Sequence, residues 1–240
     1  MTIAVVAALP AELAPLARRL ACRRPRAVGA AGEGRLGGRE LTLWVTGAGA
    51  GNARRGLVEL LSVRRPQALL GIGAAGALSA SLSRGDLVVA EAVIDAASRR
   101  PVGGNDSRFA RAARRVSGAT PGSIVTAPAI AYDAEAKARL ARLAPSSPAV
   151  VDLESAVWAE LAEKAGVASL FVRGVTDGYD ETLPLDFERY RDSAGGIDSR
   201  RIVLAACRRP AIWPRLLELR RRLRWVAEQL ARWTVEAVAA

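Results

Sequence analysis

Three acidic residues stand just after apolar segments of the chain, where side chains that do chemistry are expected. Glu12, Glu154 and Asp177 each follow a short apolar run, and in open α/β sheets ligands bind beyond the carboxyl ends of the strands. The 240 residues include no histidine, which excludes Ser-His-Asp and Cys-His nucleophile systems, HExxH metalloproteases and most transition-metal sites. Proton transfer must therefore fall to Asp, Glu, Lys, Tyr or water.

Two glycine-rich segments also follow apolar runs. Gly71–Gly76 fits GxGxxG, and Glu91 lies at the spacing of a ribose-binding acid in a dinucleotide fold. Only Ala77–Ser83 separates this motif from the next turn, which is too short for the crossover of about a dozen residues in a parallel βαβ unit, so a dehydrogenase is disfavoured. Gly47–Gly51, with Asn52 as a helix N-cap, either binds an anion or ribose oxygens or simply allows close packing.

The elements that must position these residues alternate along the chain. Strands are expected at Ile3–Leu9, Leu41–Thr46, Ala68–Ile72, Asp86–Ile94, Val150–Val151 and Leu170–Val175, helices at Ala11–Leu20, Asn52–Val63 and Glu154–Ala165, and loops at Gly29–Gly38, Arg99–Asn105 and Pro145–Pro148. This rhythm predicts an α/β fold, with a single domain over residues 1–240 and a mixed, mostly parallel central sheet flanked by helices.

Composition narrows the partners and the location. The net charge of +11 comes almost entirely from arginine, since Lys137 and Lys164 are the only lysines, and only 5% of the chain is aromatic. We therefore favour a compositional bias and expect no nucleic-acid partner. Cys22 and Cys207 lack metal-ligand spacing and are expected to be buried thiols, with no metal site. The absence of a charged leader and of a bilayer-spanning apolar run predicts a cytoplasmic protein.

The order and spacing of several segments resemble a known family over most of the chain. These segments run from Ile3 to Leu13, from Gly71 to Leu78, from Gly85 to Val89, from Val151 to Ser155 and from Val172 to Asp177. Together they resemble the purine nucleoside phosphorylase and nucleosidase superfamily, particularly the methylthioadenosine/S-adenosylhomocysteine nucleosidases. The resemblance implies a nucleoside phosphorylase-like fold, a small purine nucleoside as partner, a homodimer and no cofactor.

The resemblance also assigns roles to the acids. A ribosyl–purine bond breaks through an oxocarbenium-like transition state, which needs a proton donor for the base, negative charge near the ribose and a positioned nucleophile. The resemblance implies that Asp177 protonates purine N7, that Glu154 holds the ribose hydroxyls and that Glu12 activates the attacking water. Raised by burial or by a neighbouring carboxylate, the pKa of Asp177 would suit an acid near neutral pH. Further substrate-binding residues are expected to be Leu9, Gly47, Ala74, Gly76, Ile130, Leu153 and Thr176.

Each acid also has a purely structural interpretation. Glu12 fits the first turn of a helix, Asp152 and Glu154 fit the start of another, and Asp177 fits an ordinary loop. Three acids at successive strand ends, in one family's order, favour the catalytic interpretation jointly. We expect Asp152 to play a structural or supporting role. A catalytically silent nucleoside-binding protein is the alternative of another class.

Departures from the family pattern affect specificity. Leu153 stands where a methionine is usual, Ala74 replaces a serine, and Ile130 occupies the place of an aromatic residue that stacks on the purine. The segment Leu70–Ala75 offers neither the arginine nor the serine with which related phosphorylases hold phosphate, and Glu12 would repel a dianion. Hydrolysis is therefore preferred, with inorganic phosphate kept open as a co-substrate that Arg54, Arg55 or Arg84 would approach.

The C-terminal region has a narrower resemblance and a basic character. Leu183-Pro184, Asp192–Gly195, Arg208–Pro210 and Trp213–Leu217 resemble the hopanoid-associated branch, whose members are named phosphorylases and act on adenosylhopane. We expect residues 197–240 to be a helical extension. We expect it to be basic, because the segment from Arg189 to Arg224 contains 11 arginines and only three acidic residues.

An apolar stripe runs along the predicted C-terminal helix. It comprises Leu216, Leu219, Leu223, Val226, Leu230, Trp233 and Ala237, and Arg215, Arg221, Arg222, Arg224 and Trp225 lie beside or opposite it. The stripe either packs on the protein's own core or a second subunit, which is the usual outcome, or docks peripherally on the inner membrane surface.

Overall fold

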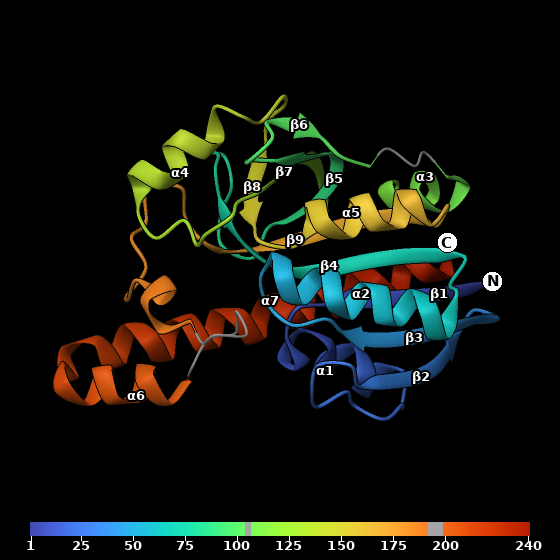
Figure 1. Ribbon diagram of the computed structural model, residues 1–240, viewed down its shortest axis with the longest axis horizontal. Coiled ribbons are helices and arrows are strands. Elements are labelled where there is room, and N and C mark those ends of the chain that lie inside the picture. The colour runs from blue at the N-terminus through green and yellow to red at the C-terminus, as the bar shows by residue number, and fades with distance from the viewer. Residues whose placement is uncertain (104–106, 192–198) are drawn as a thin grey trace.

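A mixed β-sheet with helices on both faces forms the centre of the structure (Figure 1), a computed structural model that describes residues 1–103, 107–191 and 199–240. Its strands are β1 (Thr2–Ala7), β2 (Ala31–Leu36), β3 (Arg39–Val45), β4 (Ala68–Ala77), β5 (Leu87–Asp95), β6 (Arg100–Pro101), β7 (Thr120–Thr126), β8 (Ala149–Asp152) and β9 (Ala168–Asp177). Their order is β2-β3-β1-β4-β8-β7-β5-β6, with β9 joining β4 to β5.

The sheet combines parallel and antiparallel pairings. The pairs β1–β3, β1–β4, β4–β9, β5–β7 and β7–β8 are parallel, and the pairs β2–β3, β4–β8, β5–β6 and β5–β9 are antiparallel. The mixed, mostly parallel sheet expected from the sequence is thus confirmed. Because β4, β8, β7, β5 and β9 pair in a closed circuit, this half of the sheet curls into a ring and leaves fewer open edges.

The helices cover opposite faces of the sheet. They are α1 (Pro10–Arg19), α2 (Ala50–Arg64), α3 (Arg108–Arg114), α4 (Ala134–Ala141), α5 (Ser155–Lys164), α6 (Ser199–Arg208) and α7 (Trp213–Ala239). Val5 of β1 belongs to a core that includes Leu13 of α1 and Leu230 of α7, whereas the next residue, Val6, belongs to a core with Trp158 of α5. Successive side chains of a strand point to opposite faces, so the sheet separates these two cores.

Several boundaries differ from the sequence-based expectation. The segment Gly29–Gly38 is not a loop, because it contains β2, whose weak strand sequence Ala-Gly-Glu-Gly-Arg-Leu is held by antiparallel pairing with β3. Arg99–Asn105 contains the short strand β6, and Asn105 lies outside the described residues. The expected strand Ile3–Leu9 ends at Ala7, and Leu9 is the N-cap of α1.

The two glycine-rich segments also differ from expectation. Gly71–Gly76 is not a turn after a strand, because it lies inside β4, which removes the dinucleotide-binding interpretation. Asn52 does not cap α2, since the helix begins at Ala50 with Gly49 as its N-cap, and the Asn52 side chain donates to the Ala48 carbonyl. The turn after β3 is therefore shorter than expected, because α2 begins at Ala50. Strand β4 is longer than the expected strand Ala68–Ile72.

The C-terminal helix α7 uses its apolar stripe within the protein. From Val226 onward the stripe packs into the core shared with α1, while α6 and the first part of α7 extend to the left of the sheet in Figure 1. Arg222 pairs with Glu181 and Glu218, and Arg215 donates to the Thr182 carbonyl. The stripe is therefore turned inward rather than toward an external surface.

Both cysteines are free thiols, but the expectation that both are buried was wrong. Cys22 is half-buried, and burial raises the pKa of its thiol, whereas Cys207 is exposed on α6. Within the described residues, none of the helices is both long and apolar enough to cross a bilayer.

Candidate active site

A cavity of about 290 Å³ opens where β1, β4, β8 and β9 end, and it gathers the three acids expected from the sequence. Its lining includes Leu9, Glu12, Ala74, Gly76, Ile130, Leu153, Glu154, Thr176 and Asp177. Gly47, the remaining predicted binding residue, does not line the cavity among the described residues, although its neighbour Ala48 does. The parallel strands β1, β4 and β9 end at this edge of the sheet, and β8, which runs antiparallel to β4, reaches it because Val151 pairs with Gly76 near the end of β4.

Glu12 points from the first turn of α1 across to β4. Its Oε1 accepts a hydrogen bond from the Ala74 amide at 2.9 Å, and its Oε2 accepts one from the Leu9 amide at 2.8 Å. Burial raises the pKa of the Glu12 carboxyl, while these amides and the charge of Arg173 act in the opposite direction. The side chain caps its own helix and also reaches the cavity, so its structural and chemical interpretations are compatible.

Glu154 does not cap the helix that it precedes. Its Oε1 instead accepts a 2.7 Å hydrogen bond from the amide of Gly49, in the turn before α2. Burial first, and then the neighbouring charge of Asp152, raise the pKa of Glu154 to about 7. A carboxyl group held in this way changes charge near neutral pH and is available to hydroxyl groups in the cavity.

Asp152 lines the cavity and is bound by three neighbouring groups. Its Oδ2 accepts from the Ser155 amide at 2.9 Å and from Arg173 Nε at 2.8 Å, and its Oδ1 accepts from Thr126 Oγ1 at 2.7 Å. Asp152 therefore binds the first turn of α5 and a buried cation at once, which is the structural or supporting role expected from the sequence.

Arg173 is a buried charged residue beside the site that the sequence interpretation missed. It stands in the middle of β9 with only 1% of its surface exposed, pairs with Asp152, donates to Ser155 Oγ at 2.9 Å and lies 5.0 Å from the centre of the Trp158 ring. A Cβ on Gly73 would lie 2.5 Å from Arg173 Nη1 and 3.1 Å from Glu12 Oε1, so only glycine fits between them. The signal was available, because an arginine inside an apolar strand is rarely buried without a specific partner.

Asp177 ends β9 next to a buried lysine. Its Oδ2 lies 2.5 Å from Lys137 Nζ, and its Oδ1 accepts a hydrogen bond from Thr176 Oγ1 at 2.8 Å. A Cβ on Gly76 would come within 2.9 Å of Asp177 Oδ2, so the strand alongside must carry glycine there. The neighbour of Asp177 is thus an ammonium group and not the carboxylate that the sequence interpretation allowed for.

The remaining wall of the cavity is apolar. Ile130, Leu153, Leu183, Phe187, Ile202, Leu219 and Leu223 line it. The last three come from α6 and the first part of α7, so the projecting C-terminal helices complete the cavity instead of standing apart from it. This accounts for two residues of the apolar stripe, Leu219 and Leu223.

The arginines considered as phosphate ligands lie elsewhere. Arg54 pairs with Glu160 and Arg84 with Glu181, and no arginine lines the cavity within the described part of the chain. That part also contains no group of three or more Cys, Asp or Glu side chains that would hold a metal ion.

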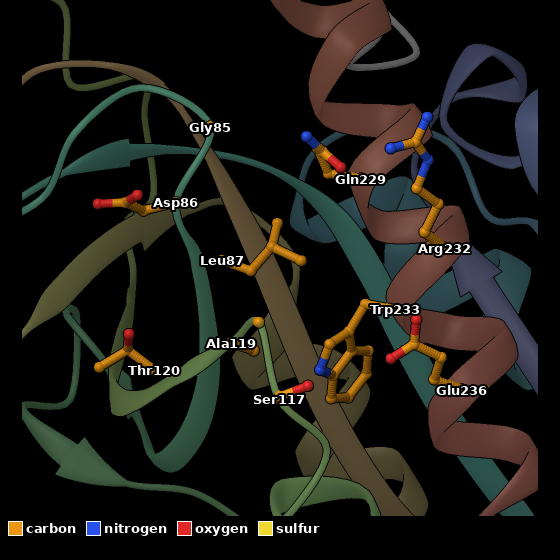
Figure 2. A pocket seen from close by; sticks show the side chains of 11 residues that line it. Gly85, Asp86, Leu87, Ser117, Ala119, Thr120, Gln229, Arg232, Trp233 and Glu236 are labelled. Atoms are coloured by element: carbon orange, nitrogen blue, oxygen red, sulfur yellow. The ribbon is translucent and has the colours of Figure 1, made fainter.

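A second hollow, of about 520 Å³, lies between α7 and the start of β5, away from the three acids (Figure 2). Gln229, Arg232, Trp233 and Glu236 of α7 line one side of it, opposite Leu87. Of these side chains the two apolar ones, Trp233 and Leu87, are buried in the core, while Arg232 and Glu236 are exposed. The clustered buried acids therefore single out the smaller cavity as the candidate active site.

Comparison with known proteins gives consistent matches over almost the whole chain. A family model described as "Phosphorylase superfamily" matches residues 2–208. A 5′-methylthioadenosine/S-adenosylhomocysteine nucleosidase of Geobacillus kaustophilus is 27% identical over 216 residues, which cover 81% of this chain and 92% of that protein.

Solved structures match the fold. The S-adenosylhomocysteine nucleosidase of Streptococcus pyogenes in complex with 5-methylthiotubericidin superposes with a TM-score of 0.73 at 19% identity, covering 100% of this chain and 96% of that one. Futalosine hydrolase of Helicobacter pylori superposes with a TM-score of 0.74 at 16% identity, covering 99% of this chain and 97% of that one. At these identities the likeness establishes the fold alone.

Proposed function

The chain belongs to the phosphorylase superfamily, and from this we propose that it is a nucleosidase that hydrolyses the N-glycosidic bond of a purine nucleoside of the 5′-modified adenosine type. The observation that carries the proposal is the convergence of Glu12, Glu154 and Asp177, all buried, on one cavity. The relative from Geobacillus kaustophilus, named as such a nucleosidase, supports the same reaction.

The proposal gives each acid a separate role. Asp177 lies at the end of β9 and would deliver a proton to N7 of the departing purine, which weakens the bond to ribose. Glu154 would accept hydrogen bonds from the ribose hydroxyls and favour the positive charge that develops on the sugar. Glu12 would orient and deprotonate the attacking water, since its carboxylate is held between two backbone amides and beside Arg173.

Water is favoured over phosphate as the nucleophile. Glu12 and Glu154 place negative charge in the cavity, and among the residues that the structure describes none of the lining side chains is an arginine. A phosphate dianion would be repelled there, whereas water would be bound and activated. Phosphorolysis remains the second candidate because of the sequence resemblance to adenosylhopane phosphorylases.

The apolar wall indicates the kind of 5′ substituent. Phe187, Ile202, Leu219 and Leu223 line the same cavity as the acids, so burying an apolar group against them would contribute roughly 25 cal/mol per Å² of covered surface. We therefore propose that the 5′ group is apolar, either a small thioether or a hopane-type lipid.

Product analysis tests these proposals directly. The protein is incubated with methylthioadenosine, adenosylhomocysteine and a lipid-linked adenosine, with and without phosphate, and the products are separated by chromatography. Free adenine and a free ribosyl product without phosphate are expected. Cleavage only in the presence of phosphate would replace hydrolysis by phosphorolysis, and no adenine release from any nucleoside would leave a silent binding protein.

We propose in addition that α6 and the first part of α7 contact an anionic membrane surface. Val203, Leu204, Leu217 and Trp225 are exposed there, and Arg220, Arg221 and Arg224 are exposed beside them. Basic residues with interfacial tryptophan suit anionic headgroups. These exposed residues, and not the inward-facing stripe, support the contact.

Vesicle sedimentation tests the membrane proposal. Wild-type protein should sediment with anionic vesicles at low salt and be released at high salt, and replacing Arg220, Arg221 and Arg224 by glutamine should abolish binding. A matched triple replacement at Arg35, Arg64 and Arg100, away from α7, should leave binding unchanged. Equal loss in both variants would point to net charge alone. The homodimer and the cytoplasmic location stay predictions.

A further inference from the structure

We infer that Lys137 is the proton source behind Asp177, so that the departing purine receives its proton from a lysine–aspartate pair. This inference rests on the proposed function and names a residue that the sequence interpretation left out. Lys137 would act through Asp177 rather than touch the substrate, and it is therefore a positioning residue.

The fold buries Lys137 without an evident structural gain. It is 1% exposed, and it is the only fully buried residue of α4, an eight-residue helix whose other side chains are half-buried or exposed. A lysine is almost never fully buried unless it is paired, because removing its charge from water costs more than the pair returns. An apolar residue would fill this position with a smaller desolvation penalty. The presence of a lysine therefore indicates that the site needs the ammonium group itself.

The hydrogen bonds around the pair define which group carries the proton. Lys137 Nζ donates to Asp177 Oδ2 at 2.5 Å, to the Gly178 carbonyl at 2.6 Å and to the Glu181 carbonyl at 2.9 Å. These three bonds use all three hydrogens of an ammonium group. Asp177 accepts on Oδ2 from Lys137 and on Oδ1 from Thr176. In the resting arrangement Asp177 is thus an acceptor, and the acidic proton lies on Lys137.

The proton and electron balance of the reaction follows from this arrangement. As the bond between ribose C1′ and purine N9 breaks, its electron pair moves into the base. Lys137 passes a proton to Asp177 Oδ2 and becomes a neutral amine, and Asp177 passes a proton on to N7 and is a carboxylate again. Water adds its hydroxyl to C1′ and gives its proton to Glu12, which releases it to solvent, and Lys137 regains a proton from solvent.

The loop that follows β9 keeps the pair together. The Gly178 amide donates to Glu181 Oε2, and the Glu181 carboxylate pairs with Arg84 and with Arg222 of α7. The two carbonyls that hold Lys137 therefore belong to a loop fixed by α7, the same helix that lines the apolar wall. Lys137 is oriented by backbone groups and can lose a proton without losing its place.

Two substrates with different leaving groups test the inference. Methylthioadenosine needs a proton on its base, whereas a nitrophenyl riboside releases a stable phenolate and needs none. Lys137→Met should lower kcat for methylthioadenosine by about 10² to 10⁴, the range for a general acid, and change kcat for the nitrophenyl riboside by no more than about threefold. Lys164→Met, the other lysine and an exposed one, is the matched control and should leave both rates unchanged.

Lys137→Arg separates proton supply from charge. Arginine keeps the positive charge but does not lose its proton in proteins, so this variant should be as slow as Lys137→Met with methylthioadenosine and normal with the nitrophenyl riboside. Circular dichroism establishes which variants are folded, and Lys137→Gln replaces the methionine variant if that one unfolds.

Three outcomes would overturn the inference. Equal losses with both substrates would show that Lys137 has only a structural role. Normal methylthioadenosine cleavage by Lys137→Arg would show that only the positive charge is needed. Normal turnover by Lys137→Met would show that Lys137 has no part in the reaction. Wild-type protein that cleaves neither of these substrates nor a lipid-linked adenosine would instead refute the proposed function, on which the inference rests.

Discussion

Replacing Glu154 by glutamine should stabilise the protein while abolishing its activity. Burial and the charge of Asp152 raise the Glu154 pKa from 4.5 to about 7, so the folded state binds a proton more tightly than the unfolded chain. Between these two pKa values the stability falls as the pH rises, and above pH 7 the folded protein carries the whole cost of the buried charge. Glutamine keeps the shape and can still accept the Gly49 hydrogen bond, but it carries no charge.

The magnitude follows from the shift. At about 1.36 kcal/mol per pKa unit, the difference amounts to on the order of 3 kcal/mol at pH 8, and coupling to Asp152, Arg173 and Glu12 makes this an upper value. For a protein of this size a gain of 1 kcal/mol raises Tm by about 2 to 4 °C. The expected gain is therefore several degrees at pH 8 and small at pH 4.5, where Glu154 is protonated in the folded state and about half protonated in the unfolded chain.

Thermal unfolding of the variant and of wild type at pH 8 and pH 4.5 measures this difference. The control is Glu160→Gln, because Glu160 pairs with Lys164 and Arg54 at the surface and the pKa of its carboxyl is lowered. That replacement should leave Tm unchanged or slightly lower it. A Glu154→Gln variant that gains nothing at pH 8, or gains as much at pH 4.5, would show that the buried charge does not strain the fold.

Three further predictions concern the reaction. Asp177→Asn should lower turnover by about 10² to 10⁴ while nucleoside binding, measured by calorimetry, stays nearly unchanged, because the proton is transferred in the transition state; near-normal turnover would mean that Asp177 is not the acid. A 2′-deoxynucleoside should be a poor substrate of wild type, since Glu154 would lose a ribose hydroxyl, and equal turnover of the ribo and 2′-deoxy substrates would remove that role. Gly73→Ala should lower both Tm and activity, because its Cβ would meet Arg173 Nη1 at 2.5 Å. The control for the packing effect is Gly51→Ala, where the nearest atom to the new carbon is Arg55 Nη1 at 3.7 Å; equal Tm losses in the two variants would contradict the close contact.

The positions of the three acids could be predicted because they depend on local sequence. Apolar β-rich runs mark strands, a strand ends where polar residues begin, and ligands bind beyond the carboxyl ends of the strands. Together with the family resemblance, this led us to expect Glu12, Glu154 and Asp177 at one site, and the structure brings them together. Their chemical roles stay predictions.

The groups around those acids could not be predicted in the same way. Lys137 lies in a short helix rich in alanines and charged residues, where the sequence does not distinguish a buried lysine from an exposed one. Only the tertiary structure shows that Lys137 is buried against Asp177 at the end of β9. The burial of Arg173 could be suspected, because an arginine inside an apolar strand is unusual. Its partner could not be predicted, because Asp152 lies on another strand and the register between strands decides which charges meet.

Strand β2 and helix α7 show the same division. The sequence of β2 has little preference for extended structure, and its pairing with β3 overrides that preference. The apolar stripe of α7 was determined by the sequence, because a spacing of three and four residues places side chains on one face of any helix. What the face covers was decided by tertiary structure: Val226 and Leu230 enter the core, whereas Leu219 and Leu223 close the active-site cavity. Periodicity fixes the direction of side chains relative to their own helix, and only the path of the whole chain fixes what lies opposite them.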